Sequence, residues 1–307
     1  MKYIIKTENI SKNYGKIKAV DGVSLEISKG EIYGFLGVNG AGKTTTIRML
    51  LGMIKASEGE AFLYGERVSP GKKHIWKKVG YIVESPYSYP DLTVEENLEI
   101  VRRLRQLSDR KTVDEIITRL KLSPYRKRKT RNLSTGNLQR LGLAKALLHK
   151  PEILILDEPS NGLDPAGIAE VRKLLIELSN RGVTIFISSH ILGEISKLVS
   201  RIGIIHQGQL IQDIKKEKLE EFREKRLLLS ACQPEEAKKV LVRSGFKVRE
   251  NKEGNIEIKD QKAVEHPEKI AEILVRAACP PTLLSVKKED LESYFLRLIG
   301  ITGGDVE

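Results

Sequence analysis

Two adjacent carboxylates, Asp157 and Glu158, follow the apolar run ILIL at residues 153–156. Aliphatic residues without polar alternation are typical of a strand that is buried on both faces. A carboxylate at the edge of a core costs free energy unless a cation or a proton donor meets it. The sequence therefore predicts a positively charged or protic partner beside this pair, as in metal-assisted or acid–base chemistry.

A glycine-rich segment offers such a setting. Residues 37–44 read GVNGAGKT, which fits the pattern G-x-x-x-x-G-K-[ST] of loops that bind nucleotide phosphates. The glycines let backbone N–H groups curl around phosphate oxygens, and the following helix adds partial positive charge. We expect Lys43 to reach the β- and γ-phosphates and the Thr44 hydroxyl to bind Mg²⁺. The residues expected to contact nucleotide are Gly37, Val38, Asn39, Gly40, Ala41, Gly42, Lys43, Thr44 and Thr45.

The alternative for this segment is a glycine turn with an incidental lysine. The segment lies between a predicted strand and a predicted helix, which favours phosphate binding. In a parallel sheet, ligands bind beyond the carboxyl ends of the strands, where the loop and the carboxylates both lie. We therefore expect Asp157 to face Mg²⁺, directly or through water. Glu158 is expected to face the water that attacks the γ-phosphate, as general base or positioning group.

Strand and helix patterns alternate over residues 1–215, which we expect to form one domain. Strands are expected at 30–37, 79–84, 153–157, 183–190 and 202–208. Helices are expected at 44–54, 97–107, 168–180 and 191–199. Thr93 and Glu96 have the spacing of a capping box for the second of these helices. Together the patterns predict an α/β domain whose mainly parallel sheet is covered by helices, with a helical subdomain before residue 150.

The pattern of charged and apolar residues changes near residue 216. A charged helical connector at 214–226 leads into segments with the order β-α-β-β-α-β. That order predicts a small accessory α+β domain over residues 216–307, of the split β-α-β or ferredoxin-like kind. A last helix at 291–299 has an apolar face and is expected to pack on this domain. We find no catalytic constellation in this part of the sequence.

Composition places the chain among globular proteins that carry a basic surface. The net charge is +12, which suits a polyanionic partner such as nucleotide, nucleic acid or anionic lipid. No apolar run approaches the ~20 residues that span a bilayer, and the first residues lack a signal-peptide pattern. The two cysteines, Cys232 and Cys279, have no metal-ligand spacing and are expected to be reduced. A cytoplasmic location is therefore expected.

The order of the motifs resembles that of the nucleotide-binding subunits of ABC transporters, over about residues 4–210. In this resemblance GVNGAGKT is the Walker A loop and ILILDE is Walker B. LSTGN at 133–137 is the signature, and SNGLD at 160–164 is the D-loop. Ser134 and Gly136 match the signature pattern LSGGQ. His190 matches the switch histidine, and Tyr14 matches the tyrosine that stacks on adenine.

The resemblance implies an ABC-type P-loop fold that binds and hydrolyses ATP with Mg²⁺. The implied catalytic residues are Lys43, Glu158 and His190. The implied Mg²⁺ ligands are Thr44, Asp157 and Glu84. In this family the signature of one subunit completes the nucleotide site of another. Since this chain has one loop and one signature, the resemblance implies a head-to-tail homodimer. It also implies a separate membrane permease subunit, which holds the dimer on the inner face of the cell membrane.

Several of these matches have simpler explanations. Tyr14 fits an ordinary half-exposed strand tyrosine as well as an adenine platform. His190 fits a satisfied interior histidine as well as a donor to the γ-phosphate. Asp164 fits the N-cap of a helix that begins at Pro165. Ser134 fits a helix N-cap, and it can serve both roles because such a helix points its N-terminus at phosphate.

The sequence departs from the family pattern at three positions. Glu84 stands where the family usually has a glutamine that touches Mg²⁺ and the attacking water. A glutamate can still bind Mg²⁺, but it adds negative charge and cannot donate when ionised. Thr135 and Asn137 replace a glycine and a glutamine of the signature. The region around Glu84 resembles the branch of bacitracin and lantibiotic exporters; a neutral exchange at a tolerant position is the alternative.

Three functions compete. The first is the ATPase of an exporter that works through a separate permease, with a peptide antibiotic or drug as the candidate cargo. The second is a soluble ABC ATPase acting on nucleic acid or ribosomes, which the net charge suggests. That function is disfavoured because the chain has neither a second cassette nor a long coiled coil. The third is an importer ATPase. The basic run at 121–132 either is a solvated surface or lies near lipid headgroups or the permease.

Overall fold

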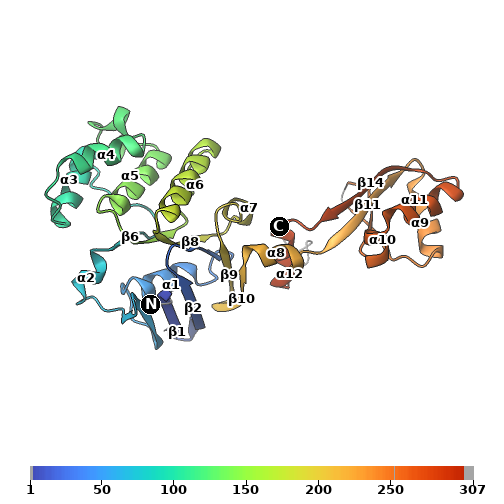
Figure 1. Ribbon diagram of the computed structural model, residues 1–307, viewed down its shortest axis with the longest axis horizontal. Helices are drawn as coiled ribbons and strands as arrows, with labels where there is room; N and C mark the ends of the chain where they lie inside the picture. Colours follow the sequence, from blue (N-terminus) through green and yellow to red (C-terminus); the bar gives the residue numbers. More distant parts are fainter. Residues whose placement is uncertain (1–2, 252, 301–307) are drawn as a thin grey trace. The chain divides into compact units, whose positions relative to one another are not determined.

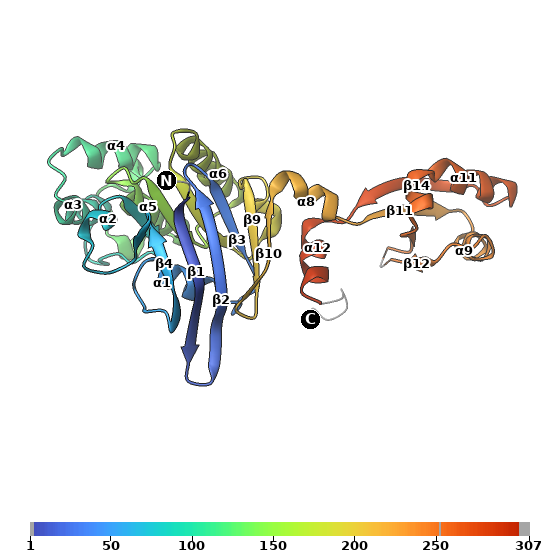
Figure 2. The same cartoon turned by 60° about the horizontal axis from the view of Figure 1, so that its bottom comes forward.

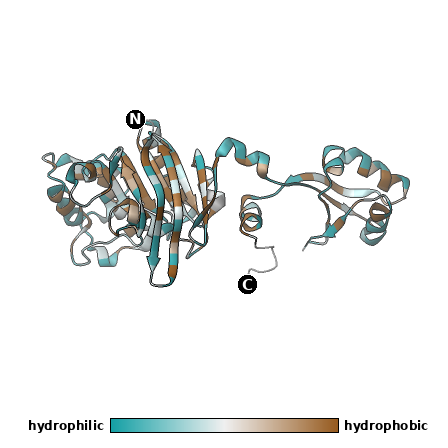
Figure 3. Ribbon diagram, turned by 90° about the horizontal axis from the view of Figure 1, so that it is seen from below, coloured by the Kyte–Doolittle hydropathy of each residue, from teal (hydrophilic) through white to brown (hydrophobic). Residues whose placement is uncertain are grey.

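The computed structural model describes residues 3–251 and 253–300 (Figure 1). The chain divides into two compact units, Met1–Glu217 and Lys218–Glu307. The boundary expected between residues 215 and 216 lies two residues before this division. Hydrophobic residues gather on the strands of each unit, while the helices carry hydrophilic residues on their outer turns (Figure 3).

A six-stranded sheet forms the centre of the first unit. Its order is β10-β9-β3-β8-β7-β6, and only β10 runs antiparallel to its neighbour. The strands are β3 (Ile32–Leu36), β6 (Val79–Ile82), β7 (Ile153–Asp157), β8 (Thr184–Ser189), β9 (Arg201–His206) and β10 (Gln209–Lys215). Every residue of β3, β7 and β8 is buried, because both faces of the sheet are covered. The predicted α/β fold with a mainly parallel sheet is confirmed.

One face of this sheet is covered by α1 (Lys43–Leu50) and by a second, antiparallel sheet (Figure 2). The second sheet has the order β2-β1-β4-β5. Its strands are β1 (Tyr3–Tyr14), β2 (Ile17–Ser28), β4 (Glu58–Leu63) and β5 (Glu66–Arg67). Ile153 and Ile155 of β7 belong to the core between the two sheets, together with Ile47 of α1. This antiparallel sheet was not predicted from the sequence.

The opposite face carries α5 (Thr135–Leu147) and α6 (Pro165–Asn180), as Figure 1 shows. Asp164 is the N-cap of α6 and accepts a hydrogen bond from the Gly167 amide at 2.9 Å, so the capping role predicted for it is confirmed. Two other helices are short: α2 (Lys73–Trp76) and α7 (Leu192–Ile195). The helix expected over 191–199 was therefore predicted too long.

A helical region follows β6, with α3 (Val94–Leu104), α4 (Lys111–Arg119) and 3₁₀ turns at Ser123–Tyr125 and Thr130–Asn132. The predicted capping box is present, because Thr93 and Glu96 bond each other's backbone amide. Asn97 is fully buried, and its amide group bonds the backbone of Tyr89 at both N and O. Lys145 of α5 donates to the Asn97 side chain at 3.0 Å. These bonds tie the segment after β6 to α5.

The second unit has an antiparallel sheet of order β12-β13-β11-β14. Its strands are β11 (Lys225–Ala231), β12 (Val248–Glu250), β13 (Ile256–Ile258) and β14 (Pro281–Lys288). Its helices are α9 (Pro234–Arg243), α10 (Gln261–Glu265), α11 (Pro267–Arg276) and α12 (Leu291–Leu298), after the connector α8 (Lys216–Phe222). Leu227 and Leu229 of β11 pack with Leu241 of α9 and Leu274 of α11. The elements follow the order β-α-β-β-α-β, with α10 added before α11.

The last helix, α12, does not join the core of this sheet. Tyr294 and Phe295 are buried but lie outside that core. Arg297 instead donates to the Phe222 carbonyl at 3.0 Å and pairs with Glu289 at 2.9 Å. The helix was expected to pack on the accessory domain, and its described contacts lie within that domain but outside the core of the sheet. Its contacts are with the end of α8 and the segment before α12.

Within residues 3–251 and 253–300, the helices are all too short or too polar to cross a lipid bilayer.

The Asn97 network gives a prediction about stability. Asn97→Ala should lower the free energy of unfolding by about 2–4 kcal/mol, because it leaves several buried polar groups without partners. Chemical denaturation monitored by circular dichroism measures the change. Asn180→Ala, at an exposed position at the end of α6, is the control and should change stability by less than about 0.5 kcal/mol. Equal stability of the two variants would contradict the structural role of the network.

Candidate nucleotide-binding site

The glycine loop joins β3 to α1 and is packed against neighbouring backbone. Gly42 has a φ of 108°, and a Cβ atom there would lie 2.6 Å from the Ala19 carbonyl oxygen. A Cβ atom on Gly37 would lie 2.5 Å from the Ile205 carbonyl oxygen. A side chain at either position would clash with neighbouring backbone, so only glycine fits. The backbone amides of the loop are therefore open to a ligand. The loop therefore has the form of an anion-binding cradle at the start of a helix.

Three of the predicted catalytic side chains meet at this loop. The Lys43 Nζ atom donates to the Gly37 carbonyl at 2.7 Å and lies 3.3 Å from Oε1 of Glu158. The other carboxylate oxygen of Glu158 lies 2.8 Å from Nδ1 of His190. Glu158 thus bridges an ammonium group and an imidazole. These contacts bring together residues that are widely separated in the sequence.

The second carboxylate is held by hydroxyl groups. Asp157 is almost fully buried and accepts hydrogen bonds from Thr44 at 2.8 Å and from Ser188 at 2.6 Å. The Ser188 oxygen also accepts from the Glu158 amide at 3.1 Å. The role of Ser188 was not predicted from the sequence. The feature of the sequence that could have indicated this role is a polar residue near the end of the strand next to β7.

This arrangement fits a Mg²⁺ ion. The hydroxyl of Thr44 and the carboxylate of Asp157 are the oxygen ligands that Mg²⁺ prefers, and they already lie side by side. Within the described residues, no group of three or more acidic, histidine or cysteine side chains could hold a metal alone. The ion would therefore take its remaining ligands from phosphate oxygens and water, as is usual for Mg²⁺ in phosphoryl-transfer sites. When bound, the ion would neutralise phosphate charge.

Glu84 lies at the same edge of the sheet but contacts other residues than Asp157 and Glu158 do. Ile82 of β6 is in register with Leu156 of β7, so Glu84 and Glu158 each lie two residues beyond this paired position. Both have a positive φ, 55° and 49°, which is uncommon for residues with a side chain and occurs often at functional sites. Oε1 of Glu84 is 2.6 Å from Nη2 of Arg48. No described contact joins Glu84 to Thr44 or Asp157.

Tyr14 has no described contact with this cluster. Tyr14 ends β1 at the tip of a hairpin, is 47% exposed, and has the Lys12 ammonium 5.3 Å from its ring centroid. No described contact joins Tyr14 to residues 37–45, so both explanations of Tyr14 stay open. Its exposed ring remains available for stacking.

The signature segment is built into the start of α5. Ser134 caps this helix and accepts from the Asn137 amide at 3.3 Å. The Thr135 methyl group packs on the D-loop, where a Cβ atom on Gly162 would lie 2.5 Å from it. Gly136 also faces Gly162, because a Cβ atom on Gly136 would be 3.2 Å from the Gly162 carbonyl oxygen. No described contact joins Ser134 or Gly136 to residues 37–45 of the same chain.

The basic run at 121–132 is largely paired with acidic side chains. Arg126 and Lys127 both bond Glu95 at 2.5 Å, and hydrogen bonds from these two cations lower the pKa of Glu95 to about 2. Arg131 pairs with Asp91 at 2.7 Å. These contacts favour the solvated-surface explanation of the run over a cationic patch for lipid or nucleic acid.

Comparison with known proteins identifies the family. Residues 20–161 match the family described as ABC transporter. The chain is 41% identical over 310 residues to the bacitracin transport ATP-binding protein BcrA of Bacillus licheniformis, with 100% of both chains covered. This chain belongs to the ABC transporter ATP-binding proteins. As a member of that family it binds ATP and is an ATPase.

Other members of the family support this assignment. The lantibiotic transport ATP-binding protein SrtF of Streptococcus pyogenes is 37% identical over 68% of this chain and 89% of its own length. A solved dimeric structure of the ATP-binding cassette MJ0796, bound to ADP and Pi, has a TM-score of 0.64 at 25% identity. It covers 69% of this chain and 98% of the other. The first unit thus has the fold of an ABC cassette.

The bond between Ser188 and Asp157 gives a prediction for this ATPase. Ser188→Ala should shift the Mg²⁺ dependence of ATP hydrolysis to higher concentration by about tenfold, because losing a bond to a charged group costs about 1.5 kcal/mol. Hydrolysis measured against Mg²⁺ concentration at fixed ATP gives the shift. Ser189→Ala is the control, since its hydroxyl bonds the Ile191 amide and not Asp157. Superimposable Mg²⁺ curves for the two variants would refute the role of Ser188 in holding the Asp157 carboxylate for Mg²⁺.

Proposed function

We propose that this ATPase powers export through a separate membrane permease, and that its cargo is a peptide antibiotic or similar drug. The observation that carries the proposal is the meeting of Lys43, Glu158 and His190 at the glycine loop, beside Thr44 and Asp157. This constellation fits ATP hydrolysis with Mg²⁺. The direction and the cargo rest on the similarity to proteins named for bacitracin and lantibiotic transport.

Each residue has a distinct part in this proposal. Glu158 accepts a proton from, or orients, the water that attacks the γ-phosphate. Lys43 stabilises phosphate charge, and His190 donates to the γ-phosphate. In this proposal Thr44 and Asp157 hold Mg²⁺, and Glu84, which follows the neighbouring strand at the same edge of the sheet, supplies a further ligand. Tyr14 stacks on the adenine.

The working form in this proposal is a head-to-tail homodimer. Ser134 and Gly136 have no described contact with the glycine loop of their own chain, so they are free to meet the phosphate bound by a second chain. The N-terminus of α5, capped by Ser134, carries partial positive charge that favours such an anion. The dimeric structure of MJ0796 is a precedent in a similar cassette.

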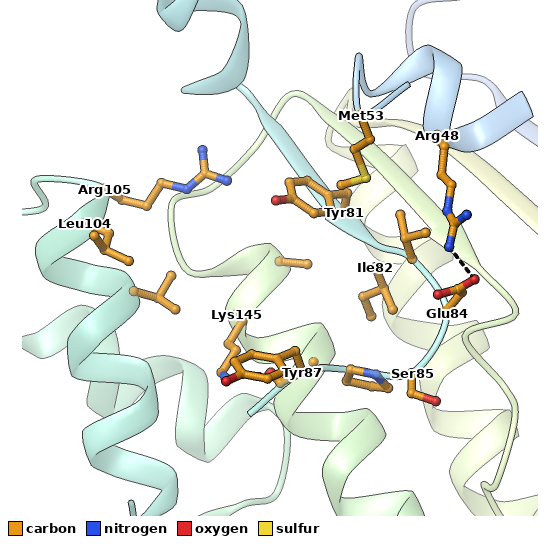
Figure 4. Close-up of a pocket in the computed structure, with 15 residues that line it drawn as sticks. Arg48, Met53, Tyr81, Ile82, Glu84, Ser85, Tyr87, Leu104, Arg105 and Lys145 are labelled. Atoms are coloured by element: carbon orange, nitrogen blue, oxygen red, sulfur yellow. Dashed lines mark hydrogen bonds and ion pairs between the residues drawn. The ribbon is translucent and has the colours of Figure 1, made fainter. Parts of the chain in front are cut away.

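A groove beside Glu84 offers a docking surface for the permease. It has a volume of about 480 Å³ and lies between the segment after β6, the end of α3 and α5 (Figure 4). Large apolar side chains are exposed along it: Tyr87 is 74% exposed and Leu104 is 76% exposed, and Met53 and Tyr81 lie nearby. Exposed apolar groups around a groove are typical of protein-binding surfaces. We propose that a cytoplasmic segment of the permease occupies this groove and holds the ATPase at the inner face of the membrane.

The nucleic-acid alternative has no comparable support. The net charge of +12 suggested it, but the densest basic run is paired with Glu95, Asp91 and Asp114. Surface pairs of this kind leave little free positive charge for a phosphate backbone.

The catalytic assignment is tested at Glu158. Glu158→Gln should bind ATP normally and hydrolyse it at least about 100-fold more slowly, because an amide cannot accept the proton that a general base must take. Nucleotide binding and steady-state phosphate release give the two quantities. Glu152→Gln, just before β7 and paired at the surface with Lys78, is the matched control and should hydrolyse ATP at the normal rate. Near-normal turnover by Glu158→Gln would remove this residue from the mechanism.

The docking assignment is tested by recovery from native membranes in mild detergent. The wild-type chain should recover a protein with several apolar spans, and Tyr87→Ser with Leu104→Ser should recover at most about one fifth as much, as expected when buried apolar contacts worth about 1 kcal/mol or more are lost. Ile176→Ser, which alters an exposed apolar residue of α6, should leave recovery unchanged. Undiminished recovery by the double variant would exclude the groove. Recovery of only soluble factors or nucleic acid by the wild-type chain would exclude the transport function.

A further inference from the structure

The ion pair between Arg48 and Glu84 joins two segments that border both the nucleotide site and the groove. Nη2 of Arg48 is 2.6 Å from Oε1 of Glu84, and both residues line the groove (Figure 4). Arg48 lies in the last turn of α1, and Glu84 follows β6. Neither the motif pattern nor the family resemblance pointed to Arg48.

The position of Arg48 follows from the geometry of α1. Thr44 and Arg48 are four residues apart on this helix, so their side chains share one face and lie about 5–6 Å apart along it. Thr44 bonds Asp157 at the end of β7. Glu84 follows β6, the neighbour of β7 in the sheet. The pair therefore lies about one helical turn from the Thr44–Asp157 contact.

The charges at this edge of the sheet are unevenly balanced. Asp157, Glu158 and Glu84 supply three carboxylates, and a bound nucleotide adds several negative charges. Lys43 lies beside Glu158, whereas the described donors to Asp157 are hydroxyl groups. Arg48 is the cation that meets Glu84, the carboxylate that this chain has in place of the glutamine implied by the family resemblance. Without Arg48, Glu84 would add an uncompensated negative charge at the edge of the sheet where the nucleotide is proposed to bind.

We propose that Arg48 is a positioning residue of the ATPase site, which holds and neutralises the Glu84 carboxylate so that a glutamate can stand at this position. This inference rests on the proposed function of the same site. Arg48 acts through Glu84 and does not itself touch the nucleotide. The pair is partly exposed, with 36% of the Arg48 side chain and 59% of the Glu84 side chain accessible. Its effect on nucleotide binding is therefore modest.

A double-mutant cycle on the full-length chain tests this proposal. The equilibrium dissociation constant of MgATP is measured for the wild-type chain, Arg48→Met, Glu84→Gln and the double variant. Arg48→Met should weaken MgATP binding by about twofold to fivefold, the range expected for an exposed ion pair. In the Glu84→Gln background the same substitution should change the constant by less than the error of the measurement. Arg48→Lys should restore most of the lost affinity, because it restores the charge.

Two results would overturn the proposal. An equal loss of affinity in both backgrounds would mean that Arg48 acts on the nucleotide or the loop directly. No change in either background would mean that the pair has no role in the site. If Arg48→Met lowers the melting temperature, the cycle is repeated with Arg48→Gln, and the same two results then decide.

Two further measurements distinguish failure of this inference from failure of the proposed function. Arg67→Met removes a surface pair with Glu60, at 3.0 Å in the antiparallel sheet, and should leave MgATP binding unchanged. The proposed function fails if the wild-type chain does not hydrolyse ATP or if Glu158→Gln hydrolyses it normally. The cycle uses binding and not turnover, so its outcome is independent of those results.

Discussion

The buried carboxylate of Asp157 is the constraint on which the rest of the site depends. It lies at the end of a fully buried strand and can remain there only because hydroxyl groups of Thr44 and Ser188 meet it. Those two bonds connect the first turn of α1, the end of β7 and the end of β8. The glycine loop that precedes α1 is thereby fixed over the edge of the sheet. A Mg²⁺ ion would take up the same carboxylate and hydroxyl group.

The parallel sheet places the reactive groups at one edge, and the adjoining side chains balance their charge. The carboxyl ends of β3, β6, β7 and β8 all point to that edge, where parallel strands usually present ligand sites. Glu158 lies between Lys43 and His190, and Glu84 lies against Arg48. Each of these two carboxylates therefore has its own cationic or imidazole neighbour. Substitution of one member of a pair therefore changes the electrostatic environment of the other.

The helical region links this edge to the surfaces that a partner would contact. Asn97 and Lys145 tie the segment after β6 to α5, whose N-terminus carries the signature residues Ser134 and Gly136. The groove beside Glu84 lies along the same segment. A partner bound there, a second chain at the signature and the nucleotide at the loop would therefore all contact connected elements. In each case the connection is a hydrogen bond or an ion pair between described residues.

The sequence by itself determined the loop, the carboxylate pair and the alternation of strands and helices, because these patterns depend on residues that are close along the chain. Only the tertiary structure decided the roles of Ser188 and Arg48, because their bonds to Asp157 and Glu84 join strands and a helix that are far apart in the sequence. The antiparallel sheet and the position of α12 likewise depend on long-range pairing and packing. Strand pairing and ion pairs across elements leave no periodic pattern in the sequence, so local patterns could not predict them.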